Sequence, residues 1–401
     1  MAEAKDSLLT VRFETTGKEL TAITDWEINS SYITSTDGFS FTAFDSDPEA
    51  LANLEMQPVE LLVNGCSQVL GRIDTSEVGG NGTAWTFHGR DYIADLLECN
   101  VDPLVKIKDG DSIAAAFTEA FGPVGIDTVI SDDDIAMRNV RTGIAVKVGK
   151  GGRGYAKRLL NEYKPRKGEG AYEFGSRLVA RFGATLQPGN DRSTLVIGSP
   201  RYDQEPVSKI FRSRDPKISQ QNNVQTSQAI RDFSSFPTFA MFAGWAAKND
   251  TAGSNSTQEY DINKVVAEFS DELTRILADS TVSGRRKPGA SDAIGLGQLY
   301  RLLYFRDDEA RTQEQLRYSA LRAVSERLKN TLQYNCTLKG HVDLVSGAVW
   351  SIDTMVQVED EICRVSEPLW VAERTLKYSS SEGATTDLVC YRPSSFQFGH
   401  Q

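Results

Sequence analysis

Short runs of alternating apolar and polar residues dominate the first hundred positions of the chain. Residues 39–43 read Phe-Ser-Phe-Thr-Ala, and this period of two is typical of a strand with one buried face. A second apolar run, 59–63, leads into Asn64-Gly65, a dipeptide suited to a tight type I′ turn because both central residues adopt positive φ. The return strand passes 72–73, and 83–87 alternates again. The pattern predicts an antiparallel meander that closes into a small barrel.

Apolar residues change to helical spacing after about residue 91. Gly122-Pro123 is a stop signal for one of the predicted helices, and Gly183 suits the end of another because glycine readily adopts the left-handed conformation. We therefore expect 98–210 to be mixed α+β. The predicted elements are helices at 93–97, 113–121, 155–163 and 172–182 and strands around 186 and at 195–197.

The rest of the chain combines one apolar strand, two polar loops, a helix and a final group of strands. Residues 236–245 are apolar and aromatic enough for a strand. Between 312 and 330 apolar residues recur at helical spacing, and Thr312 with Gln315 forms a capping box, so we expect an amphipathic helix there. The other predicted elements are loops at 248–258 and 283–292 and strands at 355–358, 370–378 and 386–391.

Two pairs of segments suggest that the first domain is repeated later in the chain. Residues 76–91 and 380–394 share a glycine turn, a strand of similar length and a closing aromatic residue with arginine. Residues 37–44 and 234–242 also look alike. Sequence identity is low in both pairs, so chance similarity between hairpins is the competing interpretation.

The predicted fold class is α+β and mainly β. It has two tube-like antiparallel β-barrel domains around an α+β middle region, and it is discontinuous in sequence. The first barrel covers 1–97. The middle domain covers 98–210 and is joined by 247–330. The second barrel combines 211–246 with 331–401.

Length and composition fit a soluble protein of several domains. With 401 residues, 40% hydrophobic residues and 32 glycines, the chain can bury more than one core and contains many turns. Its start carries charges of both signs and no apolar signal-peptide core. The longest apolar stretch, 239–247, is far too short for a membrane span. Five widely spaced cysteines without a C-x-x-C pair predict buried thiols in a reducing compartment.

Charge is unevenly distributed along the chain. Residues 1–137 hold 7 Lys/Arg against 25 Asp/Glu, a net charge of −18, whereas 138–181 hold 12 against 3, a net charge of +9. The basic stretch has three interpretations: a solvated face, a contact with an acidic neighbouring subunit, or a contact with nucleic acid. The acidic first third argues against binding of free DNA.

The most recognisable chemical motif is Gly149 to Gly154, which satisfies G-x-G-x-x-G and precedes the helix expected at 155. In a dinucleotide-binding unit, such glycines let the pyrophosphate approach a helix N-terminus. No run of βαβ units surrounds this motif. A glycine loop without a ligand is therefore favoured, and a nucleotide-dependent enzyme is the alternative.

No other pattern of residues predicts catalysis or metal binding. The three histidines lack metal-ligand spacing, and the sequence contains no G-x-S-x-G nucleophile motif. Runs of carboxylates such as 132–134 and 359–361 are typical of solvated turns rather than of an acid/base pair. We therefore predict no catalytic residue, no cofactor-binding residue and no metal site, and we expect that the protein is not an enzyme.

Three stretches carry a pattern shared with one family. Residues 163–200 contain a Pro-Arg-Lys-Gly-Glu turn, a helix that ends at glycine, and a hairpin. Residues 89–103 read GRDYIADLLECNVDP, and 325–361 combine a helix, a Gly-His pair and a G-x-x-W … V-x-V-x-D pattern. Taken in their order along the chain, they resemble the Mu-like baseplate hub family of contractile phage tails, related to late-control D proteins and to the hub portion of type VI spike proteins. The chain departs from that family at 149–154 and 248–292.

The resemblance implies a homotrimer at the centre of the baseplate. Each subunit would donate two barrels to a ring of six, and the middle domain would support that ring. One face would meet the sixfold tail tube or a tube-initiator protein, and the other the threefold central spike protein, with tape measure and wedge proteins as further partners. DNA would meet the hub only in transit, and an acidic lumen would discourage it from sticking.

The resemblance also implies a location in the virion, in the tail baseplate, after assembly in the host cytoplasm. The equivalent hub of a tailocin, a toxin-injection particle or a type VI-like particle is the alternative within the same structural class. Genes beside this one would distinguish these cases. Glycan processing is a further alternative, although we expect it of the spike protein rather than of this chain.

Overall fold

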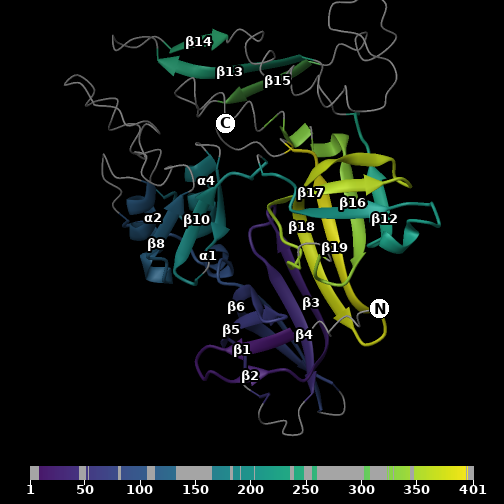
Figure 1. Cartoon of the computed structure of the whole chain (residues 1–401). Coiled ribbons are helices and arrows are strands. Elements are labelled where there is room, and N and C mark those ends of the chain that lie inside the picture. The colour runs from purple at the N-terminus through teal and green to yellow at the C-terminus, as the bar shows by residue number, and fades with distance from the viewer. Residues whose placement is uncertain are drawn as a thin grey trace, which may run out of the picture.

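A computed structural model describes most of the two expected barrels and much of the middle region (Figure 1). It also gives the course of 239–247, 255–259 and 302–307, and helical residues at 323 and 325–327. The continuously described ranges are 9–44, 51–79, 83–105, 113–131, 165–180, 184–234 and 329–395, apart from gaps at 53, 190, 203, 344–346 and 394.

The first half of a 13-stranded sheet consists of the N-terminal strands, which all pair antiparallel in the order β3-β4-β7-β6-β5-β1-β2. Alternation in the sequence directs every second side chain inward, so that Phe39, Phe41 and Ala43 of β4 are buried. These residues share one core with side chains from β1, β3, β5, β6 and β7, so the sheet curls around them. The strands are β1 (Leu9–Phe13), β2 (Glu19–Leu20), β3 (Ile23–Ser31), β4 (Gly38–Phe44), β5 (Pro58–Val63), β6 (Cys66–Val78) and β7 (Ala84–Asp91).

The predicted Asn64-Gly65 turn is confirmed. It joins β5 to β6, and its two residues have φ values of 52° and 78°. Both angles are positive, as a type I′ turn requires.

The second half of the sheet is assembled from segments that are far apart in the chain. Its order is β12-β16-β19-β18-β17-β11, in which only β11 and β17 run parallel. These strands enclose a second core that includes Tyr334, Trp350 and Leu369. The expected class, α+β and mainly β with two barrel-like units, is therefore confirmed. The strands are β11 (Ser208–Arg212), β12 (Val224–Ile230), β16 (Gln333–Lys339), β17 (Thr354–Asp360), β18 (Val365–Ser379) and β19 (Gly383–Tyr391).

The two halves repeat one strand order. The series β3-β4-β7-β6-β5-β1 corresponds to β12-β16-β19-β18-β17-β11. Register shifts also recur, at Thr24 of β3 and Gln225 of β12, and at Asp74 of β6 and Ala372 of β18. Chance similarity between two hairpins would not reproduce both the order and the bulge positions. The match between 76–91 and 380–394 therefore marks equivalent hairpins.

The match between 37–44 and 234–242 is wrong. Among the described residues, strand β13 (Phe239–Ala247) pairs with β14 (Asn255–Glu259) and β15 (Leu302–Asp307) alone, in a separate three-stranded sheet. The strand equivalent to β4 is β16. Alternation alone specifies a strand but not its partner, and this is why an apolar segment near 236 could be assigned to the wrong sheet.

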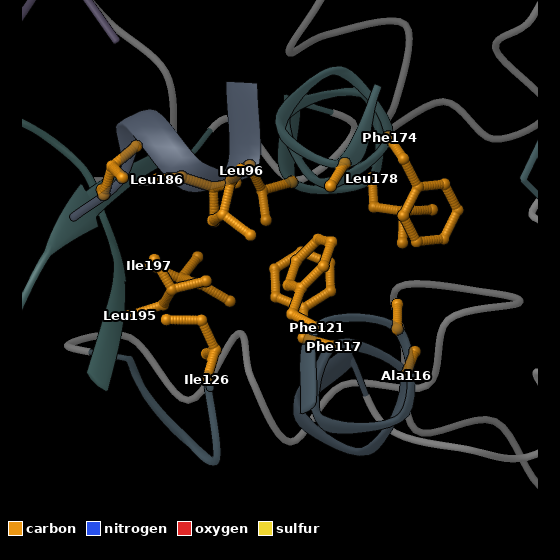
Figure 2. Packing of buried hydrophobic residues seen from close by; sticks show 14 of the residues in the cluster. Leu96, Ala116, Phe117, Phe121, Ile126, Phe174, Leu178, Leu186, Leu195 and Ile197 are labelled. Carbon is orange, nitrogen blue, oxygen red and sulfur yellow. The ribbon is translucent and has the colours of Figure 1, made fainter. Parts of the chain in front are cut away.

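The middle region packs two longer helices and a short one against a three-stranded sheet of order β8-β10-β9. Phe117 and Phe121 of one helix meet Phe174 and Leu178 of another, with Leu195 of the sheet on the same core (Figure 2). The ring centroids of Phe117 and Phe121 lie 5.0 Å apart. The elements are α1 (Ala94–Glu98), α2 (Ile113–Phe121), β8 (Thr128–Ser131), α4 (Ala171–Ala180), β9 (Thr185–Pro188) and β10 (Thr194–Gly198).

Other predicted features have mixed outcomes. The helix expected over 113–121 has those bounds, whereas the loop expected over 248–258 ends in strand β14, a polar strand that lacks the apolar alternation we relied on. Helical residues at 323 and 325–327 fall within the predicted helix 312–330. The glycine loop 149–154, the helix at 155–163, the loop at 283–292 and the remainder of 312–328 lie outside the described residues.

Phe117→Ala tests the middle core. Its ring is fully buried among the two helices, so its removal should lower the free energy of unfolding by about 3–5 kcal/mol. Glu119→Ala, on the exposed side of the same helix, should change it by less than about 0.5 kcal/mol. Denaturant unfolding followed by circular dichroism measures both, and equal effects would contradict the packing in Figure 2.

Candidate subunit interface

The two halves of the sheet join where β3 pairs with β18. Six residue pairs run antiparallel from Glu373↔Ser31 to Tyr378↔Trp26, and the two strands lie side by side in Figure 1. We call these six pairs the seam. Strand β18 serves both halves because residues 365–371 pair with β17 and the part beyond its bulge pairs with β3. The seam is therefore a continuous backbone ladder between the two repeated units.

A buried arginine lies in the middle of the seam. Arg374 is 5% exposed. Its Nη1 donates to Gln68 Oε1 at 2.8 Å and to the Trp350 carbonyl oxygen at 2.7 Å, and its Nη2 donates to Ser30 Oγ at 2.8 Å. Burial lowers the pKa of Arg374 to about 10, so the guanidinium stays charged at neutral pH. One cation thereby connects residues from both halves of the sheet.

The carboxyl group of Asp37 lies near this arginine, and Asp37 is in turn bonded to Asp91. The Asp37 carboxylate accepts hydrogen bonds from the Ser31 amide, at 3.1 Å, and from the Ser30 side chain. Burial raises the pKa of Asp37, although these bonds and Arg374 oppose the change. The Asp37 amide donates to Asp91 Oδ2 at 3.0 Å, and burial raises the pKa of Asp91 to about 7. Arg374, Ser30 and Asp37 thus form one polar group across the seam.

The Gly-His pair of the sequence places its histidine beside the seam. The rings of His341 and Trp26 have centroids 4.8 Å apart, and His341 Nδ1 lies 3.3 Å from Thr386 Oγ1. Burial, with the charge of Arg374 as a second cause, lowers the pKa of His341 to about 4. His341 is therefore neutral at pH 7 and adds no second positive charge.

The outer face of the seam carries solvent-exposed polar pairs. Thr375 Oγ1 donates to Asn29 Oδ1 at 2.7 Å. Lys377 Nζ lies 3.0 Å from Asp387 Oδ2 and 3.9 Å from Glu27 Oε2. Exposed ion pairs of this kind contribute about 0–1 kcal/mol each. The buried face, rather than this one, fixes the register.

Two further strand edges have no partner within the described chain. Strand β12 pairs with β16 on one side, and no described strand pairs with its other edge. Residues 75–78 of β6 pair with β7, whereas β5 covers only 66–72. Ile230 of β12 is 41% exposed and Val78 of β6 is 51% exposed. Exposed strand edges of this kind are templates for pairing with another chain.

Side chains from three neighbouring strands hold β12 in place. Ser227 Oγ of β12 donates to Asp360 Oδ2 at 2.5 Å, and Tyr334 OH donates to the same oxygen at 2.9 Å. Arg212 Nη1 donates to Ser227 Oγ at 2.6 Å. The exposed edge of β12 is therefore pre-positioned by the second unit.

Several side chains fix the middle region to the first unit, among them those of Tyr92 and Arg192. Tyr92 OH donates to the Thr194 carbonyl oxygen at 2.7 Å and accepts from the Gly189 amide at 2.6 Å. Arg192 Nε lies 2.8 Å from Glu14 Oε2, and its Nη2 donates to the Val59 carbonyl oxygen at 3.2 Å. The middle region thus sits on the first repeated unit.

The sequence predicts no site residue, so none of the seam residues was expected. The one signal in the sequence is an arginine at a position where the alternation of β18 predicts an inward apolar residue, because Arg374 lies on the same face as the buried Leu376. Among the described residues, no group of three His, Cys, Asp or Glu side chains could hold a metal ion. No helix in the described ranges has the length and apolar character needed to span a bilayer.

Arg374→Met tests the buried polar group of the seam. The change keeps much of the side-chain volume but leaves Asp37 without its cation and Ser30 and the Trp350 carbonyl without a donor. It should lower the free energy of unfolding by about 3–5 kcal/mol, and adding Asp37→Asn should restore part of the loss. Lys377→Met, on the exposed face, should cost less than about 1 kcal/mol. Chemical denaturation compares the unchanged chain with the three variants, and a silent Arg374→Met would contradict the role of the cation.

Asp91→Asn tests the raised carboxyl pKa by its pH dependence. The folded chain holds a proton on Asp91 up to about pH 7, whereas the unfolded chain releases it near pH 3.8. This group therefore stabilises the fold below pH 3.8, and its contribution is lost as pH rises towards 7, by at most about 1.4 kcal/mol per pH unit. Unfolding of both chains from pH 4 to 8 should show Asp91→Asn gaining stability relative to Asp91 as pH rises. A constant difference would contradict the shift.

No family model matches the sequence, and no curated protein matches it. Solved structures of tail proteins do match the fold. The tail protein from Neisseria meningitidis MC58 is 18% identical with a TM-score of 0.66, covering 97% of each chain. The 43 kDa tail protein of prophage MuSo2 from Shewanella oneidensis is 17% identical with a TM-score of 0.62, covering 98% of this chain and 99% of that one.

A third structure extends the same likeness. Prophage tail protein gp18 from Listeria monocytogenes EGD-e is 11% identical with a TM-score of 0.53, covering 96% of this chain and 94% of that one. Each match runs through nearly the whole of both chains. The resemblance carried by 89–103, 163–200 and 325–361 is therefore confirmed at the level of the fold, which this chain shares with phage tail proteins.

Proposed function

We propose that this chain is the structural hub of a contractile phage-tail baseplate, in which three copies join the sixfold tail tube to the threefold central spike. The internal repeat carries the proposal, because one chain presents two units with the same strand order and with bulges at two pairs of equivalent positions. A threefold assembly can match a sixfold one only if each subunit offers two equivalent surfaces. The fold shared with tail proteins supports a place in the tail.

The free edges support a closed ring of three chains. Strand β12 belongs to the second unit and residues 75–78 of β6 to the first, so different surfaces of the same chain would meet between copies. A head-to-tail contact of this kind builds a ring when the rotation between copies closes, and a filament when it does not. Three chains would then contribute six repeated units.

The proposed assembly places the tail tube or a tube initiator on one face of the ring and the central spike on the other. Tape measure and wedge proteins are its further neighbours, and DNA meets it only in transit. The net charge of −18 over residues 1–137 suits a passage that should not retain DNA. The role is structural rather than enzymatic, in the virion's tail baseplate after assembly in the host cytoplasm.

The equivalent hub of a tailocin, a toxin-injection particle or a type VI-like particle requires the same adaptor geometry. Capsid and genome-packaging genes beside this one would favour a phage. Toxin or secretion genes in their place would favour an injection particle.

The test is the mass of the purified full-length chain, alone and with its tube and spike proteins added, measured by light scattering. We expect a species of three chain masses that binds both partners, because three copies are needed to present six units. The spike alone should bind as one threefold assembly per three chains. A chain that stays monomeric with both partners present would overturn the proposal.

A further inference from the structure

We infer that residues 229–232, the end of β12 and the two residues after it, pair antiparallel with residues 75–78 of β6 in the next chain, and that the seam inside each chain sets the register of this contact. The inference rests on the proposed function, since its partner is a second copy of this chain. Strand β12 is the counterpart of β3, and residues 75–78 of β6 are the counterpart of the seam residues of β18. Within the described chain, each has unpaired the edge that its counterpart uses in the seam. The same contact would thus occur once inside each chain and once between chains.

The bulges of β6 and β18 show which residues of these two strands are equivalent. In β18 the register shifts at Ala372, and in β6 it shifts at Asp74. Both shifts occur against the following strand of the same hairpin. Counting four residues onward from each bulge makes Val78 equivalent to Leu376, which lies in the seam.

The bulges of β3 and β12 give the equivalent residues of these two strands in the same way. In β3 the register shifts at Thr24 and in β12 at Gln225. Counting four residues onward makes Ala229 equivalent to Ile28. The pairing of β4 with β7 and of β16 with β19 gives the same equivalence between units, without any further shift.

The equivalence predicts which residues meet between chains. Inside the chain, Leu376 lies opposite Ile28, so Val78 of one chain should lie opposite Ala229 of the next. Val78 is 51% exposed in the single chain, and Ala229 packs partly against the core of its own unit. Pairing would remove the apolar Val78 side chain from water, as the seam does for Leu376.

A polar group like that of the seam is expected between chains, with the arginine and the serine on the opposite strands of the pair. In the seam, Arg374 of β18 donates to Ser30 of β3, whose hydroxyl also bonds the Asp37 carboxylate. The register places Ser76 of β6 opposite Arg231, the residue that follows β12, two residues along each strand from the Val78 and Ala229 pair and on the same face. Ser76 Oγ already donates to the Glu55 carboxylate in the same chain. The incoming arginine would therefore meet a serine bonded to a carboxylate, as Arg374 does.

Arg231 is accessible for this contact. It is exposed, and its Nη2 donates to the carbonyl oxygens of Cys363 and Arg364 at 3.3 and 3.1 Å. These are bonds from one flexible side chain to the surface of its own unit. Charge attraction to Glu55 of the next chain gives the contact a direction, because the cation directly follows β12 and the anion lies beside β6.

Engineered cysteines test the register in the full-length chain. In a Cys66→Ser background, which removes the exposed native thiol, Val78→Cys with Ala229→Cys should form a disulfide between chains, because opposite residues of antiparallel strands have the required spacing. Val78→Cys with Ile230→Cys is the matched control. Its side chains point to opposite faces of the sheet, so it should not link.

A non-reducing gel after mild oxidation, with tube and spike proteins present, distinguishes the outcomes. Covalent species that stop at three chains, in the first pair only, support the inference. A native trimer in which neither pair links, or in which only the control pair links, overturns this register and leaves the proposed trimer intact. A chain that stays monomeric overturns both. A ladder beyond three chains overturns the closed ring.

Charge reversal gives a second measurement that does not depend on thiols. Arg231→Glu should raise the concentration at which half of the trimers dissociate by at least tenfold, because it places two carboxylates together. Glu55→Arg should do the same, and the double variant should recover most of the loss. Two additive losses without recovery would overturn the predicted pairing of Arg231 with Glu55.

Discussion

The backbone ladder between β3 and β18 is the contact on which the arrangement of this chain depends. A one-residue slip in an antiparallel ladder moves every side chain to the other face. Here a slip would direct the guanidinium of Arg374 to the exposed face and leave Asp37 buried without its cation. Buried charges contribute little net stability compared with apolar packing, but removing one of two interacting buried charges is costly. The arginine therefore selects one register rather than strengthening the sheet.

Once that register is set, a separate small cluster of aromatic residues closes the junction. Tyr32, at the end of β3, meets Trp370 of β18 edge-on at 5.3 Å between ring centroids, and Tyr202, after the middle region, meets the same indole at 5.4 Å. Trp370 Nε1 donates to Asp353 Oδ1 at 2.9 Å, and the Arg201 amide donates to that oxygen too. One tryptophan thus contacts both units and the exit of the middle region. The relative placement of the three parts follows from residues within a few positions of the seam.

Local chemistry explains which parts of this fold could be predicted from the sequence. The Asn64-Gly65 turn and the helix at 113–121 depend on neighbouring residues, so their signals lie within a few positions of each other. Strand partners depend on residues far apart in the chain, and β13 was therefore assigned to the wrong sheet. Strand β12 was overlooked because its sequence, VQTSQAI, is polar on most positions. An edge strand with little to bury has no apolar alternation to detect.

The polar sequence of β12 also helps the chain to avoid pairing with the wrong partners. A free edge rich in apolar residues would pair with many strands, whereas β12 and the end of β6 are short, bulged and followed or flanked by charge. Arg231 and Glu77 lie beside the two edges and are exposed. Two copies of the same edge would bring like charges together, since β12 would meet β12 with arginine near arginine. Only the combination of β12 with β6 brings unlike charges together, and this favours the head-to-tail contact that a ring of repeated units requires.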